Sequence, residues 1–199
     1  MKTVKVLSAI FLAGVLSASF VGCKNKKDAG PAKGEVLVDV YCSGPEFFTD
    51  KKFFRANAIG ESLDQMTAKK KAMSNARAQL ATDMNSTMKI VGDNYVKSSE
   101  FNNKEEVTET FQENARTVVD QSLQGIKVIC EKQTKTAEGK YKTYIAIELS
   151  AEEILSKYNE RLSKDELLKA DYNYEKFKET FDAEMEKMAV DEEIEKELQ

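Results

Sequence analysis

Apolar residues recur every three or four positions from residue 68 to residue 95, and this spacing predicts one long amphipathic helix. The repeating positions are Ala68, Ala72, Ala76, Leu80, Met84, Met88, Val91 and Tyr95. Residues 53–59 form a short apolar run that predicts a strand, and Gly60 allows a sharp entry from this strand into the helix. Because alanine has a small side chain, we expect the first turns of the helix to lie close against a sheet.

Both ends of this helix carry sequence signals of their own. Ser62 and Gln65 have the spacing of an N-terminal capping box, in which the two side chains satisfy backbone N–H groups. Gly92 interrupts the apolar stripe near its end, and glycine costs about 1 kcal/mol relative to alanine in a helix interior. We therefore expect the helix to begin just after Ser62 and to bend or end near Gly92.

Three other segments show strand patterns. Residues 36–42 alternate with a period of two, which predicts a strand that pairs with residues 53–60 as a broad hairpin. Ile126, Val128 and Cys130 are expected to point to one face of a third strand. A glycine turn then leads into a fourth strand, whose shared face consists of Tyr141, Thr143, Ile145, Ile147 and Leu149.

Three shorter helices are predicted from capping signals followed by apolar stripes. Asn103 opens a helix that stops before Gly125, and Ser150 opens a helix that runs to Leu162. Ser163 repeats the signal and opens a separate C-terminal helix with a charged outer face. In each case a glutamate follows the capping residue three positions later, as in a capping box.

The element order is therefore β-β-α-α-β-β-α, followed by a C-terminal amphipathic helix. This order predicts an α+β fold, with a small antiparallel sheet from two hairpins and a helix pair packed on one face. We divide the chain into a signal segment (1–22), a flexible tether (23–34), an α+β domain (35–162) and a charged helical tail (163–199).

The N-terminus has the pattern of a secretory signal. Lys2 and Lys5 precede an uncharged apolar run, residues 6–22, that is short for a membrane span. The run ends in a small residue directly before Cys23, which resembles the lipobox of bacterial lipoproteins, where the cysteine sulfur carries diacylglycerol. The alternative is ordinary signal cleavage after residues 17–19, which would release a soluble protein. We expect lipidation at Cys23, and several acyl chains would anchor the protein stably.

Two further cysteines, Cys42 and Cys130, form an even pair if Cys23 is acylated. In an oxidising compartment a bond between them would close a loop of 88 residues and contribute about 4 kcal/mol in the chain-entropy model. The alternative is two small buried thiols on an apolar face. Strand adjacency is needed to decide between them, so both interpretations stay open.

The amino-acid composition argues against several classes of function. Without Lys2 and Lys5, 28 basic residues stand against 34 acidic ones, and no domain-wide basic face exists for nucleic acid. The chain contains no histidine, no CxxC pair and no glycine-rich phosphate loop, so we expect no metal site, no cofactor and no catalytic residues. Asp64 and Asp93 would form an acid pair only if the chain folded back on itself. We therefore interpret both as solvated surface residues.

Two other features have a structural and a functional interpretation. Phe47 and Phe48 lie in a loop, where they either anchor the loop on the core or form an aromatic lip for a ligand. The run Lys69-Lys70-Lys71 either belongs to a solvated helix face or binds anionic lipid. The structural interpretation is favoured for both.

Two runs around Gly60 carry a resemblance to a known family. They read Phe54-Arg55-Ala56-x-Ala58-x-Gly60-Glu61-Ser62 and Ala68-x-x-x-Ala72-x-x-x-Ala76-Arg77-x-x-Leu80-Ala81. Together they resemble the LPP-twenty lipoproteins, small outer-membrane lipoproteins of bacteria, over about residues 36–149. The resemblance implies an α+β domain tethered to the outer membrane that contacts other envelope components, and it brings no catalytic residues.

We therefore expect a non-catalytic envelope module, held at the outer membrane through lipid on Cys23 and facing the periplasm. Its partners are the membrane and other envelope proteins, and self-association stays open. The alternative is a periplasmic protein that binds a small apolar or cell-wall ligand in a gap between the helix pair and the sheet. A core that is filled between Met84, Met88, Phe111 and Ile145 would remove that gap.

Overall fold

The computed structural model describes residue 36 and residues 38–197, with side chains described up to residue 189. The chain divides after Leu37, and the fold below is that of the unit that begins at Val38. The signal segment 1–22, Cys23 and the tether 23–34 lie outside the described residues.

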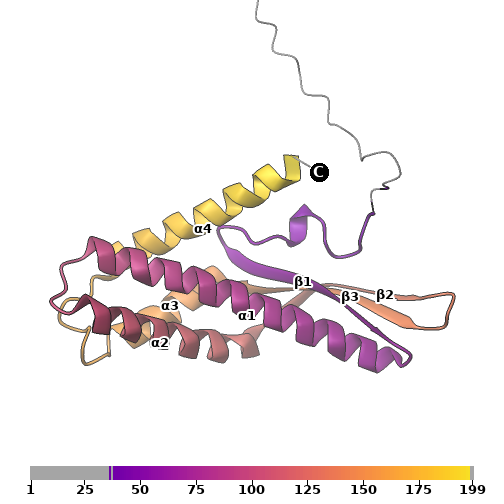
Figure 1. Cartoon of the computed structure of the whole chain (residues 1–199), viewed down its shortest axis with the longest axis horizontal. Coiled ribbons are helices and arrows are strands. Elements are labelled where there is room, and N and C mark those ends of the chain that lie inside the picture. Colours follow the sequence, from indigo (N-terminus) through magenta and orange to yellow (C-terminus); the bar gives the residue numbers. More distant parts are fainter. Residues whose placement is uncertain (1–35, 37, 198–199) are drawn as a thin grey trace, which may run out of the picture. The chain divides into compact units, whose positions relative to one another are not determined.

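The sheet consists of β1 (Phe53–Ser62), β2 (Lys127–Lys135) and β3 (Tyr141–Ser150) in the order β1-β3-β2. Both pairings are antiparallel, and β1 pairs with β3 over its whole length. The turn between β2 and β3 closes as predicted, with the Gly139 N–H donating to the Thr136 carbonyl at 3.0 Å. The predicted α+β class, with an antiparallel sheet and helices on its apolar face, is confirmed (Figure 1).

The strand predicted at 36–42 is wrong. Residues 36 and 38–42 form no strand, so the sheet has one hairpin, β2-β3, and β1 pairs with β3 instead. Val38 remains 79% exposed, and Cys42 has a φ of +59°, outside the extended region. A period of two shows that a segment suits an extended backbone, but it does not supply a partner strand.

Helix α1 (Gln65–Ser98) lies against the sheet through its alanine stripe, as predicted. All eight predicted stripe residues are buried. The N-cap is Asp64, whose carboxylate accepts from the Thr67 N–H at 2.7 Å, so the predicted cap at Ser62 is wrong. Ser62 instead ends β1, paired with Tyr141.

Gly92 does not end α1, which continues to Ser98. It faces Phe111 of the next helix, α2 (Lys104–Ser122), and a Cβ there would lie at ordinary contact distance, 3.4 Å, from the Phe111 Cβ. Asn103 caps α2 by accepting from the Glu106 N–H, as predicted. Figure 1 shows α1 running from the sheet to the other end of the unit, beside α2.

The remaining helices complete the core. After a short 3-10 turn, η2 (Leu123–Gly125), and the β2-β3 hairpin, Ser150 caps α3 (Ala151–Leu162) as predicted. The C-terminal helix α4 (Tyr174–Glu197) begins later than predicted, because the Asn173 side chain accepts from the Lys176 N–H. The Ser163 hydroxyl instead donates to the Glu160 carbonyl at the end of α3.

Helix α4 belongs to the same compact unit as the sheet. Its buried residues Phe177, Phe181 and Met185 are part of the main core cluster. The Phe181 ring packs edge-on against Phe54 of β1, with ring centroids 6.4 Å apart, and the Phe177 ring packs against Tyr95 of α1 at 5.5 Å. The segment after Ser163 is therefore a structural part of the fold up to at least Met185.

Candidate functional site

The outer face of the sheet, opposite α1, is crossed by the segment of residues 41–50, which we call the strap. It contains the 3-10 helix η1 (Pro45–Phe47) and leads into β1 (Figure 1). Its first part lies over β2 and β3 and its last part lies beside β1, so it spans all three strands. Ala146, on the outer face of β3, is fully buried.

A disulfide between Cys42 and Cys130 attaches the first part of the strap to β2, with the two Cα atoms 5.6 Å apart. Next to it, the Tyr41 ring packs edge-on against Tyr144 of β3, with ring centroids 5.4 Å apart. Of the two interpretations of this cysteine pair, the structure therefore has the disulfide.

A bulge in β2 places Cys130 on the strap side of the sheet. Val128 pairs with Ile147 and Cys130 pairs with Ala146, with a register shift between the two pairs. Since consecutive residues of β3 point to opposite faces, Val128 and Cys130 also lie on opposite faces. The prediction that Val128 and Cys130 share a face is wrong, because the bulge adds one residue and reverses the alternation.

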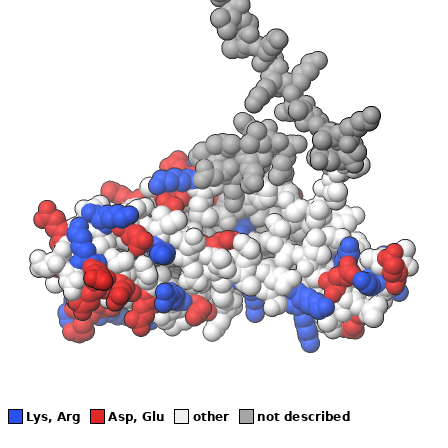
Figure 2. All heavy atoms as spheres, viewed as in Figure 1, with Lys and Arg blue, Asp and Glu red and all other residues white. Residues whose placement is uncertain are grey.

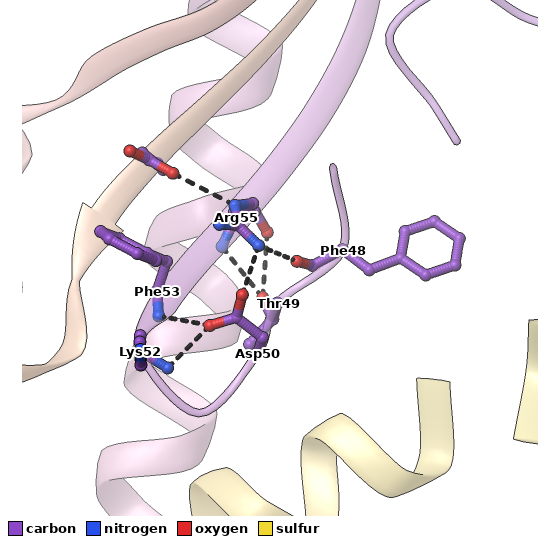
Figure 3. A network of polar contacts seen from close by, with 7 residues as sticks. Phe48, Thr49, Asp50, Lys52, Phe53 and Arg55 are labelled. Atoms are coloured by element: carbon purple, nitrogen blue, oxygen red, sulfur yellow. Dashed lines mark hydrogen bonds and ion pairs between the residues drawn. The ribbon is translucent and has the colours of Figure 1, made fainter. Parts of the chain in front are cut away.

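Arg55 of β1 attaches the last part of the strap (Figure 3). Its guanidinium donates to the Phe48 carbonyl at 2.9 Å and to the Asp50 carboxylate at 2.7 Å. It also bonds the Glu148 carboxylate of β3 at 3.2 Å. Along the backbone, Arg55 N–H donates to the Thr49 hydroxyl at 3.0 Å, and that hydroxyl donates to the Arg55 carbonyl at 3.2 Å.

Two of the three charged side chains of this network are largely removed from water. Those of Arg55 and Glu148 are 14% and 15% exposed, whereas that of Asp50 is 45% exposed. Burial alone would raise the pKa of Asp50, but hydrogen bonds from the Lys52 N–H, the Arg55 side chain and the Phe53 N–H outweigh it and hold this pKa below its ordinary value. The network therefore keeps Asp50 ionised and binds the strap to two strands at once.

A cleft of about 360 Å³ opens beside Arg55, where the strap approaches α1 and α4. It is lined by Thr49, Arg55, Asp83, Ser86, Thr87, Ile90, Glu184 and Met188. Burial raises the pKa of Asp83, although a hydrogen bond from Gln79 opposes the rise. Asp83 and Glu184 thus place two carboxyl groups in one cleft. Arg55, which also lines the cleft, already bonds Asp50 and Glu148, so its role here is to hold the strap against the strands.

The two aspartates that the sequence offers as a possible acid pair do not come together in the structure. Asp64 and Asp93 stand at opposite ends of α1, about 43 Å apart at 1.5 Å per residue. Within the described part of the chain, no group of three His, Cys, Asp or Glu side chains could hold a metal ion. Cys23, the predicted lipid attachment residue, lies outside the described residues.

The gap predicted for an apolar ligand is occupied by protein. Met84, Met88, Phe111 and Ile145 belong to one core cluster, and each is at most 1% exposed. Phe47 and Phe48 are half-buried on the strap and lie outside that cluster. Neither observation favours the ligand-binding alternative.

Sequence reasoning missed the Arg55 network. One signal was present: Arg55 is a charged residue within an apolar strand pattern, and such a residue commonly has a partner when its neighbours are buried. Its partner Glu148 lies 93 positions away, and only the register of β1 against β3 brings the two together.

No family model matches the chain, and no curated protein sequence matches it. In the described residues, no helix has both the length and the apolar composition that a membrane span requires.

Proposed function

We propose that this protein is a bacterial lipoprotein, anchored to the outer membrane through diacylglycerol and palmitate on Cys23, that acts as a non-catalytic interaction or structural module of the cell envelope. The observation that carries the proposal is the apolar run 6–22, which follows two lysines and ends in a small residue directly before Cys23. The folded unit then begins after a short tether and faces the periplasm.

The disulfide supports export from the cytoplasm. Bonds such as Cys42–Cys130 persist in oxidising compartments and are rare in reducing ones. With these two cysteines joined to each other, Cys23 is left as the cysteine available for acylation. The three cysteines therefore fit a lipoprotein of the envelope without a residue left over.

A structural role is supported by the strap network. Its polar groups bond to other groups of the same chain and hold chain segments together. The chain has no histidine to act as a general base near neutral pH. The resemblance of the Gly60 region to LPP-twenty lipoproteins gives the outer membrane as the proposed location.

Metabolic labelling tests the anchor directly. Cells that express the wild-type chain, Cys23→Ala, or the double variant Cys42→Ala/Cys130→Ala are grown with labelled palmitate and then fractionated. We expect label and membrane association for the wild type and the double variant, and loss of both for Cys23→Ala. An unlabelled wild-type protein whose mature N-terminus is Phe20 would contradict the proposal.

Proximity labelling tests the interaction role. A peroxidase fused after Gln199 should label a reproducible set of envelope proteins in the wild type, and Cys23→Ala should lose that set. Labelling that matches that of an unrelated lipoprotein fused to the same peroxidase would argue against a specific module.

A further inference from the structure

The β1-α1 connection and the β2-β3 hairpin meet at one end of the folded unit (Figure 1). The Lys69 ammonium bonds the Glu131 carboxylate at 2.8 Å, and the Lys140 ammonium bonds Glu61 at 2.8 Å. The Gln65 side chain also donates to Gln133. These contacts join residues 61–71 and 131–142 into one surface, which we call the lysine end.

The lysine end is positively charged although the chain as a whole is negative. It contains seven lysines and four acidic residues, a net charge of +3, whereas the whole chain has a net charge of −4. Among the described residues, no carboxylate lies within 4 Å of the ammonium groups of Lys70, Lys132 or Lys135. Figure 2 shows basic and acidic side chains interspersed at this end of the unit, on the right.

Two large apolar side chains project from the same surface. Leu63 is 75% exposed and Met66 is 59% exposed. Leu63 directly precedes the N-cap Asp64, a position from which an apolar side chain commonly packs against the fourth residue of the helix. That residue is Ala68, which is short and fully buried, so Leu63 has no large apolar side chain there to cover it.

We propose that the lysine end docks on an anionic phospholipid bilayer, with Leu63 and Met66 inserted into the interface and Lys70 and Lys135 facing the headgroups. Exposed apolar side chains surrounded by lysines are the pattern of interfacial membrane contacts. A protein partner fits less well, because a stable protein interface covers about 800 Å² on each side and two isolated side chains supply little of that area.

The docking proposal rests on the proposed function, because lipid on Cys23 would hold the folded unit next to a membrane. A weak contact is sufficient for a protein already held there by lipid, because tethering turns docking into an intramolecular step. The contact would also fix which end of the unit faces the bilayer, and it would leave α4 and the strap for other partners.

The chain contains no tryptophan, so a single introduced tryptophan reports on its own position. The test uses the full chain with Leu63→Trp, and the full chain with Leu167→Trp as the matched control. Leu167 is 40% exposed and lies in the α3-α4 connection, which approaches the far end of α1 where the Asn173 N–H donates to Tyr95. Far-UV circular dichroism verifies that both variants fold.

Each variant is incorporated into vesicles of brominated phosphatidylcholine, with or without phosphatidylglycerol. We expect bromine quenching and a blue shift at position 63 only in the vesicles with phosphatidylglycerol, and no quenching at position 167. Adding Lys70→Gln to Leu63→Trp should lower the ratio of docked to undocked protein about fivefold, since one lysine near an anionic surface contributes about that factor.

Equal quenching at positions 63 and 167, quenching independent of phosphatidylglycerol, or no quenching at position 63 would each overturn the docking proposal. Burial of position 63 that depends on protein concentration and not on vesicles would also overturn it and indicate self-association. Palmitate labelling of Cys23 is scored separately, so a failure of docking and a failure of lipid anchoring are distinguishable.

Discussion

Gly60 and Ala68 touch backbone to backbone: a Cβ placed on Gly60 would lie 2.2 Å from the carbonyl oxygen of Ala68. It would also lie 2.4 Å from the backbone nitrogen of Ala72. Both contacts are far shorter than van der Waals distances, and both involve backbone atoms that cannot rotate away. The close approach of α1 to β1 therefore requires glycine at this position as well as alanine in the helix.

Replacing Gly60 with alanine should destabilise the fold strongly. The added methyl group forces α1 away from β1, and overpacking of this kind costs about 1–3 kcal/mol or more. We expect a lower midpoint of denaturant unfolding, with an unchanged slope. Gly125→Ala is the matched control, because the nearest atom to a Cβ there is Leu149 Cδ2 at 3.8 Å. Equal stability of the two variants would show that α1 adapts to the methyl group.

Removing the disulfide should release the first part of the strap. It should also lower the free energy of unfolding by about 4 kcal/mol, since the bond joins residues that are 88 positions apart. The measurement is equilibrium unfolding of the wild type with and without reductant, compared with Cys42→Ala/Cys130→Ala. Reductant should lower the stability of the wild type to that of the double variant and leave the double variant unchanged. A wild type insensitive to reductant would show that the bond does not form in solution.

Arg55→Ala should cost about 2–3 kcal/mol, because it leaves the carboxylate of Glu148 nearly buried without its partner. Arg55→Lys should restore little of this loss, since an ammonium cannot reproduce three differently directed guanidinium bonds. Lys164→Ala is the control: its pair with Glu160 is also intact, but the two side chains are 71% and 67% exposed. Its effect should stay within about 0.5 kcal/mol. Similar losses for Arg55→Ala and Lys164→Ala would contradict the role of burial.

Local signals predicted the stripe of α1 and two of the four expected helix caps. The caps at Asn103 and Ser150 were found from sequence because each side chain bonds a backbone group three residues away. The stripe of α1 was found because every buried member lies on one helical face. Ser163 shows the limit of such signals, because its hydroxyl has a competing partner in the Glu160 carbonyl.

The strap depends on long-range pairing and was not predicted. Residues 38–42 have the composition of a strand, but β1 pairs with β3, and Tyr41 and Cys42 lie on the outer face instead. The side of the sheet that Cys130 faces is decided by a one-residue bulge, which no periodicity reveals. The Arg55–Glu148 bond likewise follows from the β1-β3 register, which local sequence does not specify.

Asp50 and Asp83 should affect stability with opposite signs. The folded state lowers the pKa of Asp50 from 3.8, where burial is outweighed by hydrogen bonds from Lys52, Arg55 and Phe53. Its stabilising contribution is therefore present above pH 3.8 and is lost as the pH falls through the folded pKa. Burial raises the pKa of Asp83 from 3.8, so its contribution is present below pH 3.8 and is lost as the pH rises through the folded pKa.

Asp50→Asn should therefore destabilise the protein at neutral pH, whereas Asp83→Asn should stabilise it. The Asp83→Asn difference should shrink as the pH falls towards 3.8, through the raised folded pKa of Asp83. The Asp50→Asn difference should persist at pH 3.8 and shrink only at lower pH, as the lowered folded pKa of Asp50 is passed. Thermal or urea unfolding across this pH range measures both curves. Each variant controls for the other, because both remove one negative charge. A shift of the same sign in both would indicate a general effect of net charge and would contradict the assignment of the two environments.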